Sequence, residues 1–189
     1  MSDWAPGGWL SGVRHVYSPN FGERPDSGDV SLIVVHNISL PPDHFGGPWV
    51  EQFFTNQLDP QAHPYFAQIA PLQVSAHFFV RRDGTVIQFV GCDQRAWHAG
   101  RSTWSGRENC NDFSVGIELE GSDFQAYPAE QYAALGALIE ALRQRYPITE
   151  IAGHCHVAPE RKTDPGPFFD WAELARRYPD LILPAEISF

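Results

Sequence analysis

The sequence predicts a single α/β domain in which helices flank a central mixed β-sheet. Short apolar runs rich in β-branched residues alternate with segments of helical periodicity along the 189-residue chain. An Asp-Gly turn between two of these runs predicts a hairpin, which supplies antiparallel strands to the sheet. No internal repeat or linker divides the chain. We therefore expect one domain over residues 1–189, with its core at about residues 9–178.

The first predicted strand covers residues 32–35, a short run of apolar and mainly β-branched side chains. A Pro- and Gly-rich segment at 41–48 follows the strand and predicts a long loop. Residues 49–56 can then form a short helix with Pro48 at its first turn. We expect the aromatic side chains of this helix to pack in the core rather than to form a sugar-binding platform.

The sequence pattern in the middle of the chain predicts three more strands. Residues 76–80 and 86–89 form the two arms of the hairpin. The segment Ser114–Glu120 alternates with period two, so its apolar side chains share a core face. We expect the other face to be polar, with small residues that leave room, and Glu118 to point into open space. The core face holds Val115, Ile117 and Leu119, and the polar face holds Ser114, Gly116, Glu118 and Glu120.

Two helices are predicted in the last third of the chain. Ala129–Arg145 carries apolar residues at helical spacing and stops before Pro147, which is typical of an amphipathic helix. Asp170 and Glu173 resemble a capping box that opens a last helix, which we expect to run through about Arg177.

The composition excludes several classes of protein. A hydrophobic fraction of 43% and an aromatic fraction of 13% exclude intrinsic disorder as the main state. The formal net charge of −10 disfavours nucleic acids and anionic membranes, because binding phosphates relies on clustered Lys and Arg. No apolar run approaches the roughly 20 residues of a membrane-spanning helix. We expect no nucleic acid, membrane or obligate protein partner.

We expect the chain to act in the cytoplasm. Its first ten residues lack the basic start and apolar core of a secretory signal. The three cysteines, Cys92, Cys110 and Cys155, cannot all pair with one another, and their spacing fits neither a disulfide scaffold nor a CxxC zinc site. We therefore expect reduced thiols, with Cys155 packed rather than bound to a metal.

The segment 153–166 combines two histidines, a lysine and a carboxylate with several turn residues, and we expect an irregular functional loop there. His154 and Asp164 of this segment, together with His36 at the end of the first strand, can form a set of metal ligands. Catalytic zinc commonly takes three protein ligands and a water, whose pKa it lowers to about 7. His156 is the alternative to His154 in this set.

Hydrolysis of a carbonyl compound at such a site needs a base and a donor to the oxyanion. Glu118 is the best placed base, and Glu120 is its rival. Lys162 can donate to the oxyanion, and losing one such donor typically costs about 3–4 kcal/mol of transition-state stabilisation. Of the other histidines, we expect His77 and His98 to line the cleft or satisfy core hydrogen bonds, and His15, His44 and His63 to lie on the surface.

Five short motifs carry a family resemblance. They are Val35-His36-Asn37-Ile38-Ser39, Ser75-Ala76-His77-Phe78, Ala96-Trp97-His98-Ala99-Gly100, Ile117-Glu118-Leu119-Glu120-Gly121, and Gly153-His154 with Lys162-Thr163-Asp164-Pro165-Gly166. In this order the motifs resemble the zinc N-acetylmuramoyl-L-alanine amidases, and more narrowly the AmpD-type cytoplasmic 1,6-anhydro-N-acetylmuramyl-L-alanine amidases. The resemblance runs from about Trp9 to Trp171, and the combination is far more specific than any single motif.

The resemblance implies a fold shared with peptidoglycan recognition proteins, in which zinc lies at the floor of an open cleft. It implies that His36, His154 and Asp164 hold the zinc, that Glu118 is the general base and that Lys162 stabilises the oxyanion. The implied reaction is cleavage of the amide between the lactyl group of anhydro-muramic acid and L-alanine in recycled muropeptides. Such enzymes also restrain β-lactamase induction.

Two positions depart from the family pattern. Gln73 and Asn109 stand where some members carry arginines that meet peptide carboxylates, which leaves the peptide preference open. Arg107 and Arg161 are the remaining candidates for those carboxylates, because arginine makes bidentate contacts with them. On the sugar side of the cleft we expect Asn37 and Trp97.

Two alternative functions remain open from the sequence. A non-catalytic peptidoglycan-recognition module would keep the cleft and lose a metal ligand or the base, and none of these residues is missing. An amidase acting on intact peptidoglycan would need an export signal or anchoring repeats, which the sequence does not suggest.

Overall fold

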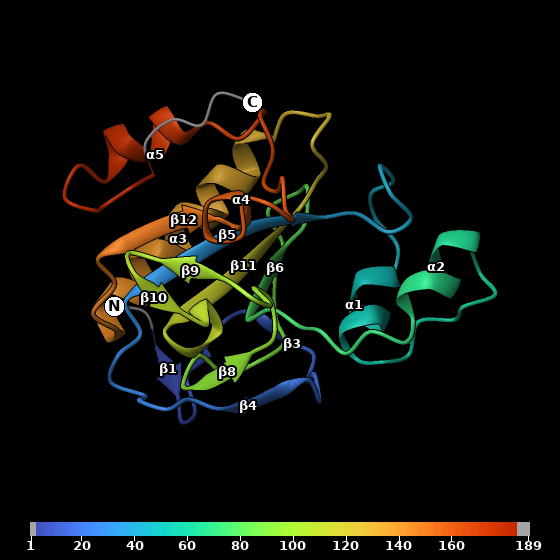
Figure 1. The fold of residues 1–189 in the computed structure, drawn as a ribbon, viewed down its shortest axis with the longest axis horizontal. Coiled ribbons are helices and arrows are strands. Elements are labelled where there is room, and N and C mark those ends of the chain that lie inside the picture. The colour runs from blue at the N-terminus through green and yellow to red at the C-terminus, as the bar shows by residue number, and fades with distance from the viewer. Residues whose placement is uncertain (1–2, 185–189) are drawn as a thin grey trace.

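The centre of the fold is a six-stranded mixed sheet (Figure 1). The computed structural model describes residues 3–184. Strands β12, β5, β11 and β6 run parallel, β7 is antiparallel to β6, and β3 is parallel to β7. In sheet order the strands are β12 (Glu150–Gly153), β5 (Leu32–Ile38), β11 (Ser114–Glu120), β6 (Phe78–Val80), β7 (Val86–Gln88) and β3 (Arg14–His15). The expected single α/β domain with a mixed sheet is confirmed.

The other elements surround this sheet. Three two-stranded sheets pair β1 (Trp4–Ala5) with β2 (Trp9–Leu10), β4 (Phe21–Glu23) with β8 (Gln94–Ala96), and β9 (Thr103–Trp104) with β10 (Arg107–Glu108). The helices are α1 (Trp49–Phe54), α2 (Pro64–Ile69), α3 (Ala129–Arg145), α4 (His154–Val157) and α5 (Trp171–Arg177), with a 3₁₀ helix at Cys110–Asp112. None of the helices in residues 3–184 has the length and apolar character needed to cross a bilayer.

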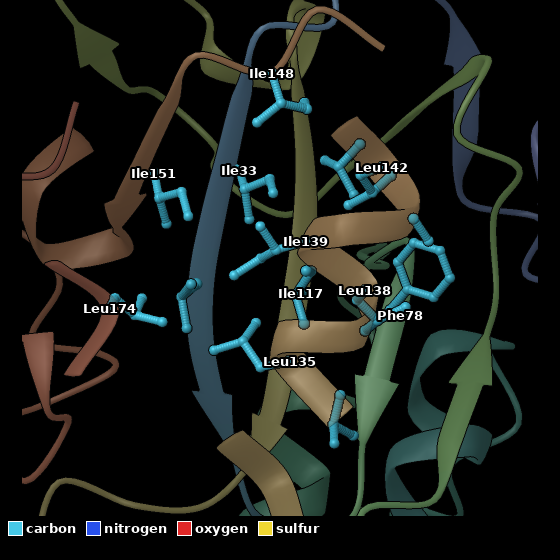
Figure 2. Close-up of a cluster of buried hydrophobic side chains, with 14 of the residues drawn as sticks. Ile33, Phe78, Ile117, Leu135, Leu138, Ile139, Leu142, Ile148, Ile151 and Leu174 are labelled. Carbon is cyan, nitrogen blue, oxygen red and sulfur yellow. The ribbon is translucent and has the colours of Figure 1, made fainter. Parts of the chain in front are cut away.

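Helix α3 covers one face of the sheet and packs against it in a cluster of buried hydrophobic side chains (Figure 2). Its Leu135 and Ile139 are fully buried and pack with Ile33 of β5 and Ile117 of β11. The odd-numbered residues of β5 and β11 point to this helix, so their even-numbered residues face the opposite side of the sheet. The period-two pattern therefore divides the sheet into a core face and a second face.

Helices α1 and α2 lie together at one side of the molecule, away from α3 (Figure 1). Phe53 and Phe54 of α1 are buried and share a second core cluster with Phe66 of α2 and Phe89. The expectation that the aromatic side chains of this helix belong to the core is confirmed for these two. Trp49 is half-buried against the Phe66 ring.

Several predicted elements are shorter than expected or more regular. The hairpin strands lose one or two residues at their outer ends, and α1 ends at Phe54. Asp170 does cap α5 by accepting from the Glu173 backbone N–H, but the Asp170 N–H donates to Tyr132 and not to Glu173. The expectation that 153–166 is wholly irregular is wrong, because its first residues form the single-turn helix α4.

The packing of α3 predicts a large cost for truncating Ile139. Ile139→Ala removes a fully buried side chain and leaves a cavity between the helix and the sheet. We expect it to lower the free energy of unfolding by about 2–5 kcal/mol in chemical denaturation. Ala137→Gln on the exposed side of the same helix is the control, with an expected change within about 0.5 kcal/mol. Equal losses in the two variants would contradict this packing.

Candidate metal centre

The register of the parallel strands brings three of the predicted site residues to one end of the sheet. Glu118 of β11 pairs with His36 of β5, and both belong to the even-numbered face. Gly153, the last residue of β12, pairs with Val35, so His154 follows at the level of His36. Because parallel strands end at the same edge of a sheet, these side chains meet there.

Asp164 reaches the same point through the turn after α4. The backbone N–H of Cys155 donates to the carbonyl of Asp164 at 2.8 Å, which holds Asp164 beside His154. A Cβ on Gly153 would lie 2.7 Å from the ring of Pro165, so only glycine allows this close approach. The short helix and the turn therefore fold back onto the end of β12.

Three ligand atoms form a tight triangle at this edge. His36 Nδ1 lies 3.0 Å from His154 Nδ1, and each of these nitrogens lies 3.1 Å from Asp164 Oδ2. Zinc ligands at about 2.0–2.1 Å in tetrahedral geometry would be about 3.3 Å apart. The three atoms also form the His/His/Asp group that is placed to hold a metal ion. The spacing and the ligand types therefore fit zinc.

The protonation states of these groups suit a metal. Burial, reinforced by the nearby His154, lowers the pKa of His36 to about 4. For Asp164, burial acts to raise the pKa, but the imidazoles of His154 and His36 outweigh it and hold the pKa of this carboxyl well below its usual value. At neutral pH His36 is thus an uncharged imidazole and Asp164 a carboxylate, which are their metal-binding forms.

The orientation of the His154 ring is fixed by a backbone group. His154 Nε2 lies 3.2 Å from the carbonyl oxygen of Ala99. A carbonyl only accepts hydrogen bonds, so Nε2 carries the proton and Nδ1 presents its lone pair to the other two ligand atoms. A partner of this kind on the far nitrogen is a common feature of metal-binding histidines.

Glu118 lies beside this triangle and lines a cavity of about 530 Å³ together with His154 and Asp164. The residue is only 9% exposed, and its Oε2 has no hydrogen-bond partner among the described residues. Burial, and then the charge of Asp164, raise the pKa of Glu118 well above its usual range. Glu118 therefore faces the cavity but does not stand in open space, which corrects the expectation from the strand pattern.

Glu120, the rival base, is occupied elsewhere. Its carboxylate accepts from the backbone N–H of Gly46 at 2.6 Å and from that of Arg82 at 3.0 Å. These bonds tie the end of β11 to the 41–48 loop and to the hairpin. Glu120 does not line the cavity, so the structure brings only Glu118 to the site.

Four other predicted residues line the same cavity. Lys162 is exposed at its edge, and its positive charge acts to lower the pKa of Glu118. Asn37 donates to Asp123 Oδ1 at 2.9 Å, and Trp97 is half-buried. Arg161 lines the cavity while its guanidinium donates to the carbonyl of Ala99 at 3.4 Å.

Arg107 is the exception among the predicted substrate contacts. It does not line the cavity but forms an ion pair with Asp29 on the protein surface. Its guanidinium also lies 3.7 Å from the centre of the Phe113 ring. Because the side chain is already paired away from the site, we do not retain Arg107 as a substrate-binding residue. The sequence shows that Arg107 is charged but not that Asp29 lies beside it in the fold.

The remaining histidines have structural partners. His156 Nδ1 accepts from the backbone N–H of Gly153 at 2.9 Å, and its ring packs on Trp171, so it is not part of the ligand triangle. His77 and His98 are buried and hydrogen-bonded, as expected. Of the three expected on the surface, His44 is exposed, whereas His15 and His63 are half-buried and hydrogen-bonded.

Two residues around the site were not recognised from the sequence. Asp123 accepts from Asn37 and from Thr163, and so joins the loop after β11 to the segment that carries Asp164. Asn111 accepts from the backbone N–H groups of His98 and Ala99. Neither residue lies in a motif that marks such a role, because each acts through a partner distant in sequence.

Comparisons of sequence and of structure with known proteins indicate the same family. Residues 26–167 match the family described as N-acetylmuramoyl-L-alanine amidase. The 1,6-anhydro-N-acetylmuramyl-L-alanine amidase AmpD of Citrobacter freundii is 57% identical over 180 residues, which cover 94% of each chain. The AmpD of Escherichia coli K12 is 59% identical over 169 residues, which cover 88% of this chain and 92% of the relative.

Solved structures show the same relationship. The crystal structure of a Se-Met AmpD derivative has a TM-score of 0.88 at 57% identity and covers 93% of this chain and 98% of that chain. The amidase AmiD from E. coli, in complex with anhydro-N-acetylmuramic acid-L-Ala-D-gamma-Glu-L-Lys, has a TM-score of 0.59 at 29% identity, with 79% of this chain and 57% of that chain covered. Bumblebee PGRP-SA shares the fold, with a TM-score of 0.58 at 15% identity. The chain therefore belongs to the N-acetylmuramoyl-L-alanine amidase family.

Proposed function

We propose that this chain hydrolyses the amide between the lactyl group of 1,6-anhydro-N-acetylmuramic acid and L-alanine in cell-wall recycling. Relatives that carry this activity in their names are 57% and 59% identical over most of the chain. By removing anhydro-muropeptides the enzyme would also restrain β-lactamase induction. The observation that carries the proposal is the triangle of His36, His154 and Asp164, which lies beside the Glu118 carboxylate on the wall of the cavity.

We propose zinc as the ion held by His36, His154 and Asp164. Two imidazoles and a carboxylate form a ligand set of the type found in catalytic zinc sites, and their spacing is suitable. When bound, zinc polarises a carbonyl group and lowers the pKa of a bound water towards about 7. The chain holds the three ligand atoms at one edge of its sheet, with His154 and Asp164 bordering the cavity.

Glu118 acts as the general base in this proposal. Glu118 lines the cavity, and its Oε2 has no hydrogen bond to the protein that would have to break before the carboxylate accepts a proton from the attacking water. A carboxylate with a raised pKa is a better base at neutral pH than an ordinary one. Glu120 has no free oxygen of this kind, because two backbone N–H groups already bind its carboxylate.

Lys162 and the cavity walls supply the remaining contacts. Lys162 lines the same cavity as Asp164, and in this proposal its ammonium group donates to the oxygen of the scissile carbonyl. We propose Asn37 and Trp97 as contacts for the sugar and Arg161 as a contact for a peptide carboxylate. The cavity of about 530 Å³ falls within the range of about 300–1,000 Å³ that holds small ligands.

We also propose that the enzyme acts in the cytoplasm. All three cysteines are unpaired and buried, as a reducing compartment allows. Cys155 packs beside the site and is not one of the three clustered ligand atoms. Fractionation of the source cells with an antibody to the chain tests the proposed compartment.

The proposed zinc site predicts a metal content of about one ion per chain. His154→Ala removes one vertex of the ligand triangle, so we expect zinc to be lost during dialysis against a weak chelator. His156→Ala is the matched control, because His156 lies two residues away but bonds to the Gly153 backbone instead. We expect the control to retain zinc in elemental analysis. Loss of zinc in His156→Ala with retention in His154→Ala would reverse the assignment.

The proposed activity predicts release of a peptide with a free L-alanine amino group from an anhydro-muropeptide. We expect cleavage with zinc, loss of cleavage with chelator and recovery on adding zinc back, followed by mass spectrometry. The reducing muramyl peptide and intact peptidoglycan serve as comparison substrates at matched zinc. Binding without cleavage would favour a recognition module, and equal cleavage of intact peptidoglycan would favour a wall amidase.

The base assignment predicts unequal effects in a pair of glutamate variants. Glu118→Ala should keep zinc and lower kcat by about 10²–10⁴-fold, because it removes the carboxylate proposed to accept the proton. Glu120→Ala should act mainly on stability, since it releases the Gly46 and Arg82 backbone groups. Steady-state kinetics, zinc content and thermal melting are measured on both. Small and equal losses of kcat would overturn the assignment.

A further inference from the structure

A chain of buried hydrogen bonds runs from the proposed ligand His36 to a backbone carbonyl. His36 Nε2 lies 2.9 Å from His98 Nδ1, and His98 Nε2 lies 3.2 Å from Ser114 Oγ. Ser114 Oγ in turn lies 2.5 Å from the carbonyl oxygen of Cys110. His36, His98 and Ser114 are all buried. We call this the His36–His98–Ser114 chain.

The carbonyl at its end sets the direction of every bond. The Cys110 oxygen only accepts, so the single hydroxyl hydrogen of Ser114 must point to it. Ser114 Oγ is then the acceptor for His98 Nε2–H, which leaves His98 Nδ1 unprotonated in the neutral ring. His98 Nδ1 accepts from His36 Nε2–H. The remaining nitrogen, His36 Nδ1, is left with a free lone pair facing His154 and Asp164.

The opposite hydrogen-bond direction, in which Ser114 donates to His98 and His98 donates to His36, is unfavourable for two reasons. It would place the Ser114 and Cys110 oxygens 2.5 Å apart with no hydrogen between them. It would also put a hydrogen on His36 Nδ1, the atom that faces the other ligands. A doubly protonated His98 is disfavoured too, because His36 and His77 surround it and the Arg24 guanidinium binds the adjacent His77.

We propose that His98 is a positioning residue that holds His36 in the Nε2–H tautomer and so prepares Nδ1 to bind the metal. The fold makes space for this ring, since a Cβ on Gly116 would lie only 2.4 Å from it. Ala99, the residue after His98, orients the second histidine of the proposed site, because its carbonyl accepts a hydrogen bond from His154. Asn111 holds both residues by accepting from their backbone N–H groups at 3.1 and 2.8 Å.

One short segment therefore orients both histidines of the proposed metal site. Residues that orient a metal-binding histidine typically change metal affinity by about 10–100-fold when they are removed. The expected effect of His98 on metal affinity rests on the proposed metal centre. The structural content of the inference, the tautomer of His36, can be measured in the metal-free wild-type chain.

The direct test is ¹⁵N NMR of the histidine rings in the metal-free wild-type chain. We expect His36 and His98 to carry their hydrogens on Nε2, with Nδ1 unprotonated in both. A hydrogen on His36 Nδ1 in most molecules would overturn the proposal, whether or not zinc binds. Failure of the wild-type chain to bind zinc would instead remove the proposed metal centre and leave the tautomer result standing.

A set of variants tests the consequence for the metal. His98→Ala should weaken zinc binding about 10–100-fold in competition with a chromophoric chelator, corrected for the folded fraction by circular dichroism. His98→Asn should recover most of the affinity, because its side-chain oxygen can accept from His36 in place of Nδ1. Ser114→Ala keeps His98 but removes the hydroxyl that decides which ring nitrogen of His98 carries the hydrogen. We therefore expect a mixture of His36 tautomers and an intermediate affinity for zinc.

His77→Asn is the matched control for damage to the buried cluster. His77 lies 5.8 Å from His98 between ring centres and accepts from the Gly116 backbone, but none of its hydrogen bonds reaches a proposed ligand. We expect this variant to lose stability and to keep its zinc affinity per folded chain. Equal zinc affinity in His98→Ala and His77→Asn would overturn the proposal.

Discussion

The site depends on the register between three parallel strands. Pairing of His36 with Glu118, and of Val35 with Gly153, places a proposed ligand, the proposed base and the residue before the second proposed ligand at one level of the sheet. A shift of one residue in β11 would turn Glu118 towards α3 and a core residue towards the cavity. The apolar face that packs on α3 resists this shift, because it would move Ile117 out of the apolar cluster and place a carboxylate there. Core packing therefore determines the geometry of the polar site.

Local patterns were sufficient for the elements that set this register. The period-two alternation of Ser114–Glu120 identified β11 and its faces, and the helical spacing of Ala129–Arg145 matched α3 at both ends. The Asp-Gly turn located the hairpin. In contrast, β12 has only four residues and lies beside a functional turn, so its sequence carries too little pattern to be recognised. The paired two-residue strands escaped prediction for the same reason.

Side-chain environments were harder to predict than positions. Glu118 was expected on the correct face, but its burial depends on the cavity walls that residues far along the chain build around it. Asp29, which pairs with Arg107, and Gly46, which donates to Glu120, are likewise 78 and 74 residues away in sequence. Charge and spacing identify a residue that is able to act, whereas long-range contacts decide whether it is free to act. Only the tertiary structure shows whether such a residue is free to act.

The core also explains how the chain tolerates an arrangement that is unfavourable by itself. His36, His154 and Asp164 bring three ligand atoms within 3.1 Å of one another at a largely buried point, and burying these groups costs free energy through desolvation. The apolar face on α3 fixes β5 and β12, and the backbone bond from Cys155 to Asp164 holds the third group beside His154. A cation that binds only the folded chain removes this cost, so its binding free energy adds to the free energy of folding. The apolar face thus stabilises the sheet on which the proposed metal ligands are held together.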